Sequence, residues 1–322
     1  MTASRTETKQ ANRPLPDVLH CIGDTSLVAL RKIAPANGVR VLLKLESENP
    51  TGSMKDRMAL AMIEAAEADG RLVAGGTVVE YTGGSTGVSL SLICSVKGYP
   101  LHIVTSDAFA KEKLDHMKIL GAKLRIVPSE SGRMTENLTR DMIEAARVIA
   151  LETGGFWTDQ LNNTDQIAAY HGLAEEIWAQ TGGRIDGFVQ SVGSAASLRG
   201  VGEMLRRHDP RIMIVAVEPA ESPVLSGGMA GAHKIDGVGA GFVVPLWHDR
   251  VADRIERVST EAAADMALRL AREEGLFAGT STGANVIAAL RLAEKLETGA
   301  TIVTLMCDTG MKYLGTYGAR LA

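Results

Sequence analysis

The sequence has 322 residues, of which 45% are hydrophobic and 22% are charged, and its formal net charge is −4. This composition is typical of a globular protein, and the length exceeds what one hydrophobic core usually organises, so we expect two domains or one large α/β unit. The slightly acidic balance argues against a broad basic surface for nucleic acid or for an anionic membrane.

At the start of the chain, the first 20 residues are polar, so we expect neither a secretory signal nor a membrane anchor. Cys21, Cys94 and Cys307 lie far apart and outside any CxxC motif, which indicates reduced and mostly buried thiols. The seven histidines form no i,i+4 pair and no HExxH motif, so no metal site is predicted. We therefore expect a cytoplasmic protein.

From Val39 onward, apolar segments typical of strands alternate with segments of helical periodicity. This alternation predicts an α/β fold with parallel sheets covered by helices on both faces, and with ligands at the carboxyl ends of the strands. The predicted strands are residues 39–46, 76–81, 101–105, 123–127, 186–192, 212–219 and 300–308, and the predicted helices are residues 58–70, 86–98, 110–121, 135–154, 194–207, 260–275 and 282–296.

Three turns rich in small residues precede predicted helices, at residues 82–87, 193–197 and 279–284. Backbone amides in such turns, together with a helix N-terminus, favour the binding of an anion. Each turn taken alone fits a purely structural role equally well. The chain contains neither GxGxxG nor GxxxxGK[ST], which disfavours nucleotide binding by those two routes.

Lys55 lies in the segment NPTGSMKDR, between a predicted strand and a predicted helix. Ser53 and Asp56 fit the capping-box spacing, which would place Lys55 in the first helical turn. There the helix dipole disfavours the ammonium form, partial burial would act in the same direction, and a neutral lysine can form a Schiff base with a carbonyl compound. The alternative is a solvated lysine beside a turn.

The segment around Lys55, KLESENPTGSMKDRMAL, resembles the cofactor-lysine segment of the cysteine synthase and cystathionine β-synthase family. These are fold type II pyridoxal-phosphate enzymes, similar in fold to the tryptophan synthase β chain, and they include O-acetylserine sulfhydrylase. Further segments agree in order from about Ile22 onward: residues 22–30, 80–104, 111–122, 215–245, 273–286 and 307–314. The ordered set is more specific than any one motif.

The resemblance implies a role for each matching residue. Lys55 would carry pyridoxal 5′-phosphate covalently and act as the catalytic base and acid, and Ser281 would contact the pyridine nitrogen unless it is only a helix N-cap. The other residues implied for the cofactor are Ser85, Gly193, Ser194, Ala195, Ala196 and Ser197. The residues implied for the amino-acid substrate are Thr82, Gly83, Gly84, Ser85, Thr86, Gln160 and Gly237, the last of which fits a plain turn equally well.

Two of these turns depart from the family pattern. In TGGSTG, Gly83 replaces a serine and Ser85 replaces the asparagine that bonds the 3′-oxygen of the cofactor in the family. In GSAAS, Ala195 and Ala196 replace two glycines, which costs about 1 kcal/mol where φ is positive and little where φ is negative.

The activity implied is β-replacement on a β-substituted L-amino acid, with O-acetylserine and sulfide giving cysteine and acetate as the leading pair. The alternatives are β-elimination, as in a cysteine desulfhydrase or a serine/threonine dehydratase, and a non-catalytic amino-acid-binding relative. The resemblance further implies a smaller mobile domain at residues 46–155, a larger cofactor-binding domain made of residues 1–45 and 156–322, a homodimer, and serine acetyltransferase as a partner. No nucleic acid or membrane partner is expected.

Overall fold

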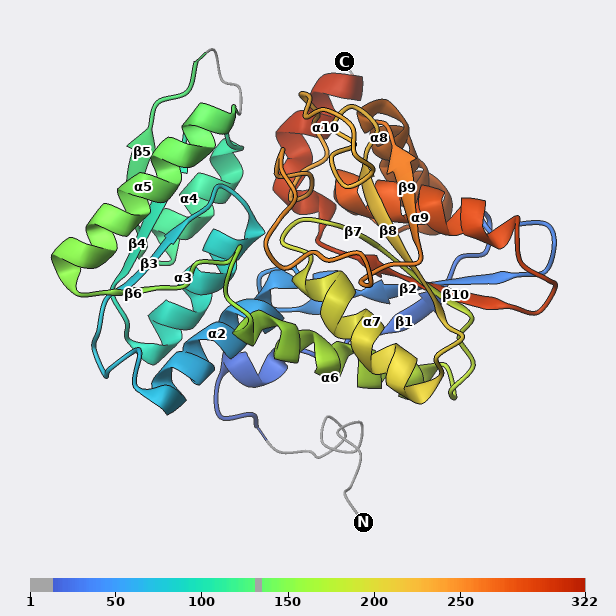
Figure 1. Cartoon of the computed structure of the whole chain (residues 1–322), viewed down its shortest axis with the longest axis horizontal. Coiled ribbons are helices and arrows are strands. Elements are labelled where there is room, and N and C mark those ends of the chain that lie inside the picture. Colours follow the sequence, from blue (N-terminus) through green and yellow to red (C-terminus); the bar gives the residue numbers. More distant parts are fainter. Residues whose placement is uncertain (1–13, 131–134, 322) are drawn as a thin grey trace.

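The computed structural model describes residues 14–130 and 135–321, and these contain two sheets that lie side by side (Figure 1). The smaller sheet is parallel, in the order β5-β4-β3-β6, and consists of β3 (Val78–Tyr81), β4 (Leu101–Ser106), β5 (Lys123–Val127) and β6 (Phe156–Trp157). The larger sheet, in the order β1-β2-β10-β7-β8-β9, consists of β1 (Leu27–Ala29), β2 (Arg40–Leu45), β7 (Gly187–Ser191), β8 (Met213–Pro219), β9 (Arg254–Val258) and β10 (Thr301–Met306). Only β1 is antiparallel to its neighbour among these strands.

Helices cover both faces of each sheet. The first half of the chain supplies α2 (Lys55–Asp69), α3 (Ser85–Lys97), α4 (Lys111–Ile119) and α5 (Glu136–Thr153). The second half supplies α6 (Asp165–Gln180), α7 (Ala196–His208), α8 (Thr260–Arg269), α9 (Thr280–Ala293) and α10 (Leu314–Leu321). Shorter turns are η1 (Val18–Cys21), η2 (Glu46–Glu48), the π-helical η3 (Leu270–Glu274) and η4 (Gly310–Tyr313).

The period of two along the strands determines which core each side chain enters. In β7, Phe188 packs with α6 and α7, whereas its neighbour Val189 packs with α8 and α9. In β3, Val78 packs with α2, α3 and α4, whereas Val79 packs with α5. The predicted parallel α/β architecture with two covered faces is thereby confirmed.

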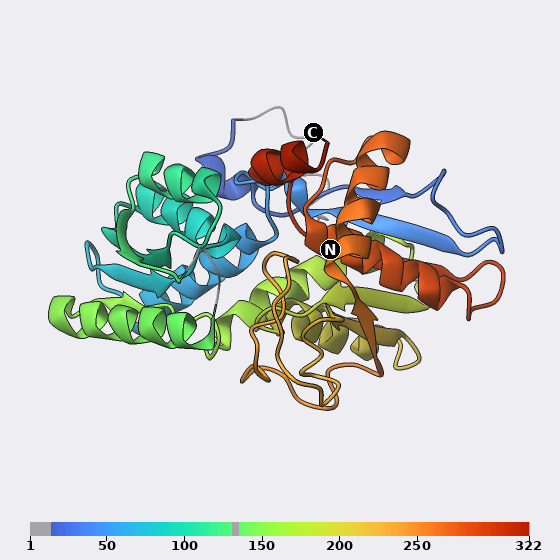
Figure 2. The same cartoon turned by 90° about the horizontal axis from the view of Figure 1, so that it is seen from above.

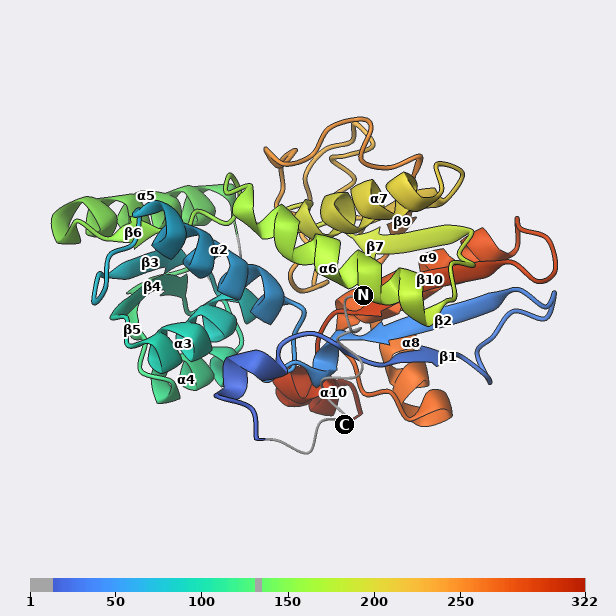
Figure 3. The ribbon, with the colours of Figure 1, turned by 90° about the horizontal axis from the view of Figure 1, so that it is seen from below.

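Helix α2 joins the two halves of the molecule. Its Ala59 and Ile63 belong to the core on the smaller sheet, while its Met58 and Met62 belong to the core that α6 and α7 form with the larger sheet. Figure 3 shows α2 beside α6 between the two sheets, and the residues of the two helices are in contact. Figure 2 shows the C-terminal helix between the two halves on the other side of the molecule. The start of α2 is therefore held by both sheets.

The predicted strands and helices are confirmed, but several elements were missed. Strands β1 and β6 have three and two residues, too few for an alternating pattern to be visible. Helix α6 carried a readable signal that was not used, because Ile167, Tyr170, Leu173, Ala174 and Ile177 recur at helical spacing and are all buried. Strand β9 and helix α10 were also not predicted.

The domain division at residues 46 and 155 stays a prediction. The smaller sheet is consistent with it, although Phe156 and Trp157 pair with β3 and so extend that sheet two residues past the predicted boundary. Part of the polar N-terminal segment, residues 1–13, lies outside the described residues. Within the described ranges, no helix combines the length and the apolar character needed to cross a membrane. All three cysteines are free; Cys94 and Cys307 are buried as expected, and Cys21 is exposed.

Candidate active site

Lys55 is the first residue of α2, as the sequence predicts. Two backbone contacts attach this helix start to the segment after β10: the Met54 amide donates to the Cys307 carbonyl over 2.9 Å, and Ser53 forms an isolated β-bridge with Asp308. The lysine thus lies at the carboxyl end of the central strands of the larger sheet, where parallel sheets bind ligands.

The predicted capping box forms only in part. The Ser53 hydroxyl accepts a hydrogen bond from the Lys55 amide over 3.2 Å, but Met54, with a helical φ of −56°, is the residue that precedes the helix. Asp56 instead accepts hydrogen bonds from the Thr51 amide (2.8 Å), the Thr51 hydroxyl (2.5 Å) and the Ser89 hydroxyl (2.6 Å). The physical reason is burial, because Asp56 lies at the contact between α2 and α3 and a buried carboxylate needs several donors.

The surroundings of Lys55 favour its neutral form. Burial of the amine is the largest influence and lowers the lysine pKa, while the nearby Cys307 and Asp308 act in the opposite direction. The residue as a whole keeps some exposed surface, although its amine is buried. The N-terminus of α2 adds to the same preference. Lys55 is therefore placed as a nucleophilic amine.

Two of the three small-residue turns contact the segment after β10, at Asp308. The turn at residues 82–87 leads from β3 into α3, and its Ser85 hydroxyl donates to Asp308 Oδ2 over 3.1 Å. The turn at residues 279–284 starts α9, and the Gly279 amide donates to the Asp308 carbonyl over 3.3 Å. Ser281 is buried, and it lies close enough to the Cys307 thiol to lower the pKa of that thiol against the effect of burial. Gly279 is the N-cap of α9, so Ser281 is not the N-cap that one interpretation allowed.

The turn at residues 193–197 connects β7 to α7 and is buried except for Gly193. Ala195 has a φ of 72°, in the left-handed region, whereas Ala196 is the first residue of α7. The first intrahelical bond runs from the Arg199 amide to the Ala195 carbonyl, and the described residues supply no partner for the amides of Ala196 and Ser197. A helix N-terminus with free amides is suited to an anion.

Gly237 lies against this turn. Its φ is 77°, and its carbonyl oxygen would be 2.4 Å from a Cβ at Gly193. No side chain can therefore be added at Gly193 without moving the backbone of the neighbouring loop. The predicted cofactor residue and the predicted substrate residue are thus brought side by side.

The predicted substrate turn is packed tightly on one side. Thr82 and Thr86 are buried, and the Thr82 hydroxyl accepts a hydrogen bond from the Gly84 amide over 3.1 Å. A Cβ at Gly83 would come within 1.8 Å of the Phe109 ring, whereas one at Gly84 would meet nothing within 4 Å. There is thus no room for a side chain at Gly83, whereas there is room for one at Gly84.

Gln160 follows β6 and hydrogen bonds the end of β3, immediately before the turn at residues 82–86. Its side-chain amide donates to the Tyr81 carbonyl over 3.1 Å, immediately before Thr82. Its backbone amide donates to Glu80 Oε2 over 3.0 Å, and burial raises the pKa of Glu80 to about 7 although Thr158, Gln160 and Tyr81 all donate to it. The structure therefore brings Gln160 to the predicted turn, through backbone contacts that the sequence does not reveal.

Gln166 connects the substrate side to the turn at residues 193–197. It is fully buried, donates to the Gln160 carbonyl over 2.6 Å, and accepts a hydrogen bond from the Ser194 hydroxyl over 3.1 Å. Sequence reasoning missed this residue because a polar side chain on a helix gives no sign of which loops it bridges.

Sequence reasoning also missed a group of polar side chains made of Asp308, Lys312 and Tyr313, which follow β10, and Lys113 of α4. The Tyr313 hydroxyl donates to Asp308 Oδ2 over 2.6 Å, and the Lys113 ammonium lies 3.3 Å from that hydroxyl and 3.0 Å from Asp236 Oδ2. Lys312 donates to the Ser85 hydroxyl over 3.2 Å. The segment CDTGMKYL contains Asp308, Lys312 and Tyr313, but no pattern in it predicts which of these side chains face the site.

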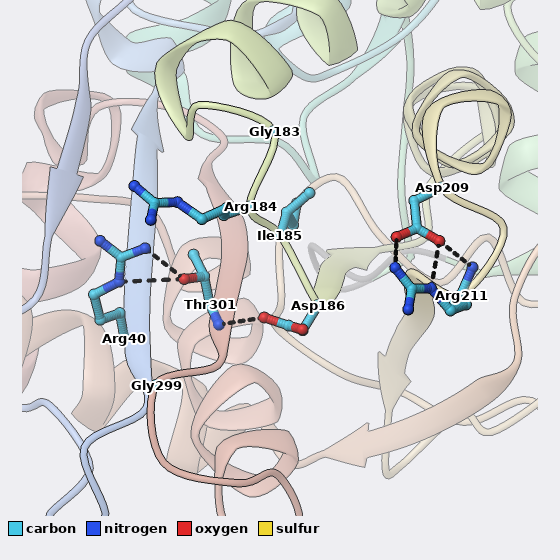
Figure 4. Close-up of a pocket in the computed structure, with 9 residues that line it drawn as sticks. All are labelled: Arg40, Gly183, Arg184, Ile185, Asp186, Asp209, Arg211, Gly299 and Thr301. Atoms are coloured by element: carbon cyan, nitrogen blue, oxygen red, sulfur yellow. Dashed lines mark hydrogen bonds and ion pairs between the residues drawn. The ribbon is translucent and has the colours of Figure 1, made fainter.

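A wide cavity of about 500 Å³ lies elsewhere (Figure 4). Its lining residues include Arg40 and Thr301 at the starts of β2 and β10, so it opens at the amino ends of the strands, opposite Lys55. Its polar groups largely bind one another: Arg40 donates to the Thr301 hydroxyl, and Arg211 pairs with Asp209. We therefore place the chemistry at Lys55 and not in this cavity.

Comparisons with known proteins show which family the chain belongs to. The family described as "Pyridoxal-phosphate dependent enzyme" matches residues 18–308. A cysteine synthase of Staphylococcus aureus is 38% identical over 308 residues, which are 95% of this chain and 97% of that protein. The crystal structure of a cysteine synthase (OASS) of Entamoeba histolytica has a TM-score of 0.89 and 35% identity, and covers 98% of this chain and 92% of its own. An O-ureido-L-serine synthase also has a TM-score of 0.89 and 35% identity, over 95% of both chains.

Proposed function

Because this chain belongs to the pyridoxal-phosphate dependent enzymes, we propose that it catalyses β-replacement on a β-substituted L-amino acid, forming cysteine and acetate from O-acetylserine and sulfide. The resemblance read from the motifs is confirmed by the family match, and the likeness to cysteine synthases over nearly the full length supports the reaction. The observation that carries the proposal is the desolvated amine of Lys55 beside Asp308, which two of the small-residue turns contact, while the third turn leaves β7, the parallel neighbour of β10.

The residues present fit pyridoxal phosphate. Lys55 offers a neutral amine to an aldehyde, and the start of α7 offers free amides to a phosphate. Gly193 cannot carry a side chain, because the carbonyl of Gly237 occupies the place of its Cβ, and this close packing fixes the position of the turn. Lys55, Ser281 and the turn at residues 193–197 would hold the cofactor. When bound, it supplies an electron sink that stabilises negative charge at the substrate Cα.

The protein's own contribution is positioning and proton transfer. We assign the removal and return of the α-proton to Lys55 Nζ, whose pKa is lowered by burial and thus moved toward the working pH. We assign binding of the substrate carboxylate to the turn at residues 82–86, at the N-terminus of α3, with Gln160 holding this turn in place. A neutral Ser281 at the ring nitrogen would make electron withdrawal moderate, which suits departure of a β-substituent.

A second candidate is β-replacement with a nucleophile other than sulfide. The likeness to O-ureido-L-serine synthase favours it, since that protein matches this chain as well as the cysteine synthase structure does. The same lysine and the same turns would serve both reactions. The nucleophile that adds at the substrate Cβ therefore has to be identified by analysing the amino acid that is formed.

We also propose the organisation that the resemblance implies: a mobile domain of residues 46–155 that closes over the substrate, a larger domain that binds the cofactor, a homodimer, and cytoplasmic residence. The two sheets and the shared helix α2 support the division into two halves. An amino-acid substrate is part of this proposal, as is binding of a serine acetyltransferase.

The test is a product assay. Purified protein would be incubated with O-acetylserine, O-phosphoserine, serine or cysteine, each with and without sulfide. Cysteine formed only from O-acetylserine with sulfide would support the proposal. Pyruvate and ammonia released without an added nucleophile would instead identify β-elimination, and a colourless protein that gains no absorption band when pyridoxal phosphate is added would identify a non-catalytic relative.

A further inference from the structure

Lys312 is a second buried amine near Lys55. It lies in η4, only 7% of its surface is exposed, and its ammonium donates one hydrogen bond, to the Ser85 hydroxyl at 3.2 Å. Within the described part of the chain it forms no ion pair with a carboxylate. Two of its three N–H groups therefore have no partner among these residues.

The charges around Lys312 are already engaged with other groups. The Asp308 carboxylate, through Oδ2, accepts from Ser85 and from the Tyr313 hydroxyl. Lys113 pairs with Asp236 and lies 4.3 Å from the centre of the Tyr313 ring. Among the described residues Lys312 hydrogen bonds only a neutral hydroxyl, while the Asp308 and Asp56 carboxylates lie near enough to favour its charged form without pairing with it. A buried ammonium is unfavourable unless an anion binds it directly.

The position of this ammonium relates it to Lys55. Asp308 lies close enough to influence the charge of both amines, and Ser85 is hydrogen bonded to both Asp308 and Lys312. The hydroxyl of Ser85 has one proton, which it gives to Asp308, so it has none left for a ligand. Lys312, which donates to this hydroxyl, has N–H groups to spare.

We propose that Lys312 binds the ring oxyanion of pyridoxal phosphate, as the donor that the short side chain of Ser85 does not provide. In this cofactor the ring oxygen is adjacent to the aldehyde carbon that Lys55 would engage. Ser85 links Lys312 to Asp308, and Asp308 forms a β-bridge with Ser53, two residues before Lys55. The ion pair would satisfy the free N–H groups of Lys312 and hold the ring oxygen in its ionised form. The inference rests on the proposed function only in that the cofactor is bound at Lys55.

The alternative anion is the carboxylate of the amino-acid substrate. We favour the ring oxygen because the carboxylate is assigned to backbone amides at the start of α3, whereas the Ser85 side chain is turned toward Asp308 and the segment after β10. The two anions differ in when they arrive, since the ring oxygen is present before any substrate is added.

The test compares Lys312→Met with Lys312→Arg and with Lys118→Met, a control on the exposed face of α4. Full-length apoprotein would be titrated with pyridoxal phosphate and, separately, with 3-deoxypyridoxal phosphate, which lacks the ring oxygen. We expect Lys312→Met to weaken binding of pyridoxal phosphate about tenfold to a hundredfold and to leave binding of the 3-deoxy analogue unchanged. The absorption of the loaded variant should shift toward the shorter-wavelength form with a protonated ring oxygen, and Lys312→Arg should restore much of both properties.

Three results would overturn the proposal. Equal weakening for both cofactors, together with a lower melting temperature of the apoprotein, would make Lys312 a structural residue. Unchanged affinity and spectrum would show that the ring oxygen has another donor. Unchanged cofactor affinity with weaker binding of L-alanine, an amino acid without a β-leaving group, would assign Lys312 to the carboxylate. None of these readouts depends on cysteine formation, so a different reaction would leave them intact.

Discussion

The aromatic ring of Phe109 occupies the place of a side chain at position 83, since a Cβ built on Gly83 would lie 1.8 Å from two of its ring carbons. Gly83 follows β3 and Phe109 follows β4, and these strands are parallel neighbours, so both loops emerge at the same edge of the smaller sheet. The family pattern has serine at position 83. The ring of Phe109 explains why glycine stands there in this chain.

We predict that Gly83→Ser lowers the free energy of unfolding by about 1–3 kcal/mol, because the new side chain has to displace the Phe109 ring. Adding Phe109→Ala should recover the loss that comes from this clash, as a double-mutant cycle in urea unfolding would show. Gly84→Ser is the matched control, since a Cβ there meets nothing within 4 Å. A Gly83→Ser variant as stable as Gly84→Ser would contradict the packing argument.

Lys55→Ala is predicted to abolish turnover and to prevent fixation of the cofactor to the protein by borohydride. The reason is that Lys55 is the amine whose pKa burial lowers at the start of α2. Mass spectrometry of the reduced protein would detect the adduct, with Lys118→Ala as the control for an exposed lysine. An adduct retained in Lys55→Ala would transfer the role to another residue.

Ala195→Gly is predicted to stabilise the protein by up to about 1 kcal/mol. Alanine at a φ of 72° is strained, whereas glycine adopts this conformation freely and gives back only part of the gain through the entropy of its unfolded chain. Ala196→Gly is the matched control, because Ala196 is helical and gains nothing from glycine. Thermal unfolding would measure the stability of both variants. Equal changes in the melting temperature of Ala195→Gly and Ala196→Gly would refute the backbone strain at Ala195.

Four charged side chains lie together where α2 and α6 meet the larger sheet. Arg57 contacts Glu46 at 2.7 Å and Glu176 at 2.7 Å, and Lys44 contacts Glu176 at 2.7 Å. Burial by itself would raise the pKa of Glu176, but the hydrogen bonds from Arg57 and the charge of Lys44 hold it at about 2. This group is therefore sensitive to acid.

We predict that this part of the stability is complete above the ordinary glutamate pKa of 4.5 and is lost as the pH falls toward 2. The depressed pKa means that protonation opposes folding, and the loss amounts to roughly 3 kcal/mol. Glu176→Gln should remove most of this dependence and destabilise the protein at pH 7, because Lys44 loses its partner. Glu175→Gln, which affects only an exposed pair with His208, is the control. The measurement is the free energy of unfolding in urea at a series of pH values. The same pH dependence in Glu176→Gln and Glu175→Gln would contradict the assignment of this acid sensitivity to Glu176.

Much of the site could be anticipated from the sequence, because the chemistry of Lys55 and of the three turns follows from local patterns. A lysine at a helix start and small residues before a helix have consequences that do not depend on the rest of the chain. The capping box at Ser53 forms only in part, because its second member, Asp56, is bound by residues that the local spacing does not indicate. Asp56 has a partner 33 residues away in Ser89, and burial made that contact the stronger one.

The sequence by itself determined the alternation of strands and helices, the covered parallel sheets and the position of Lys55 at the start of a helix. These follow from hydrophobic periodicity and helix-start chemistry, which are properties of neighbouring residues. Only the tertiary structure decided that Ser85 binds Asp308 and Lys312, more than 200 residues away. Such contacts depend on where separate loops leave the sheets, and no local pattern contains that information.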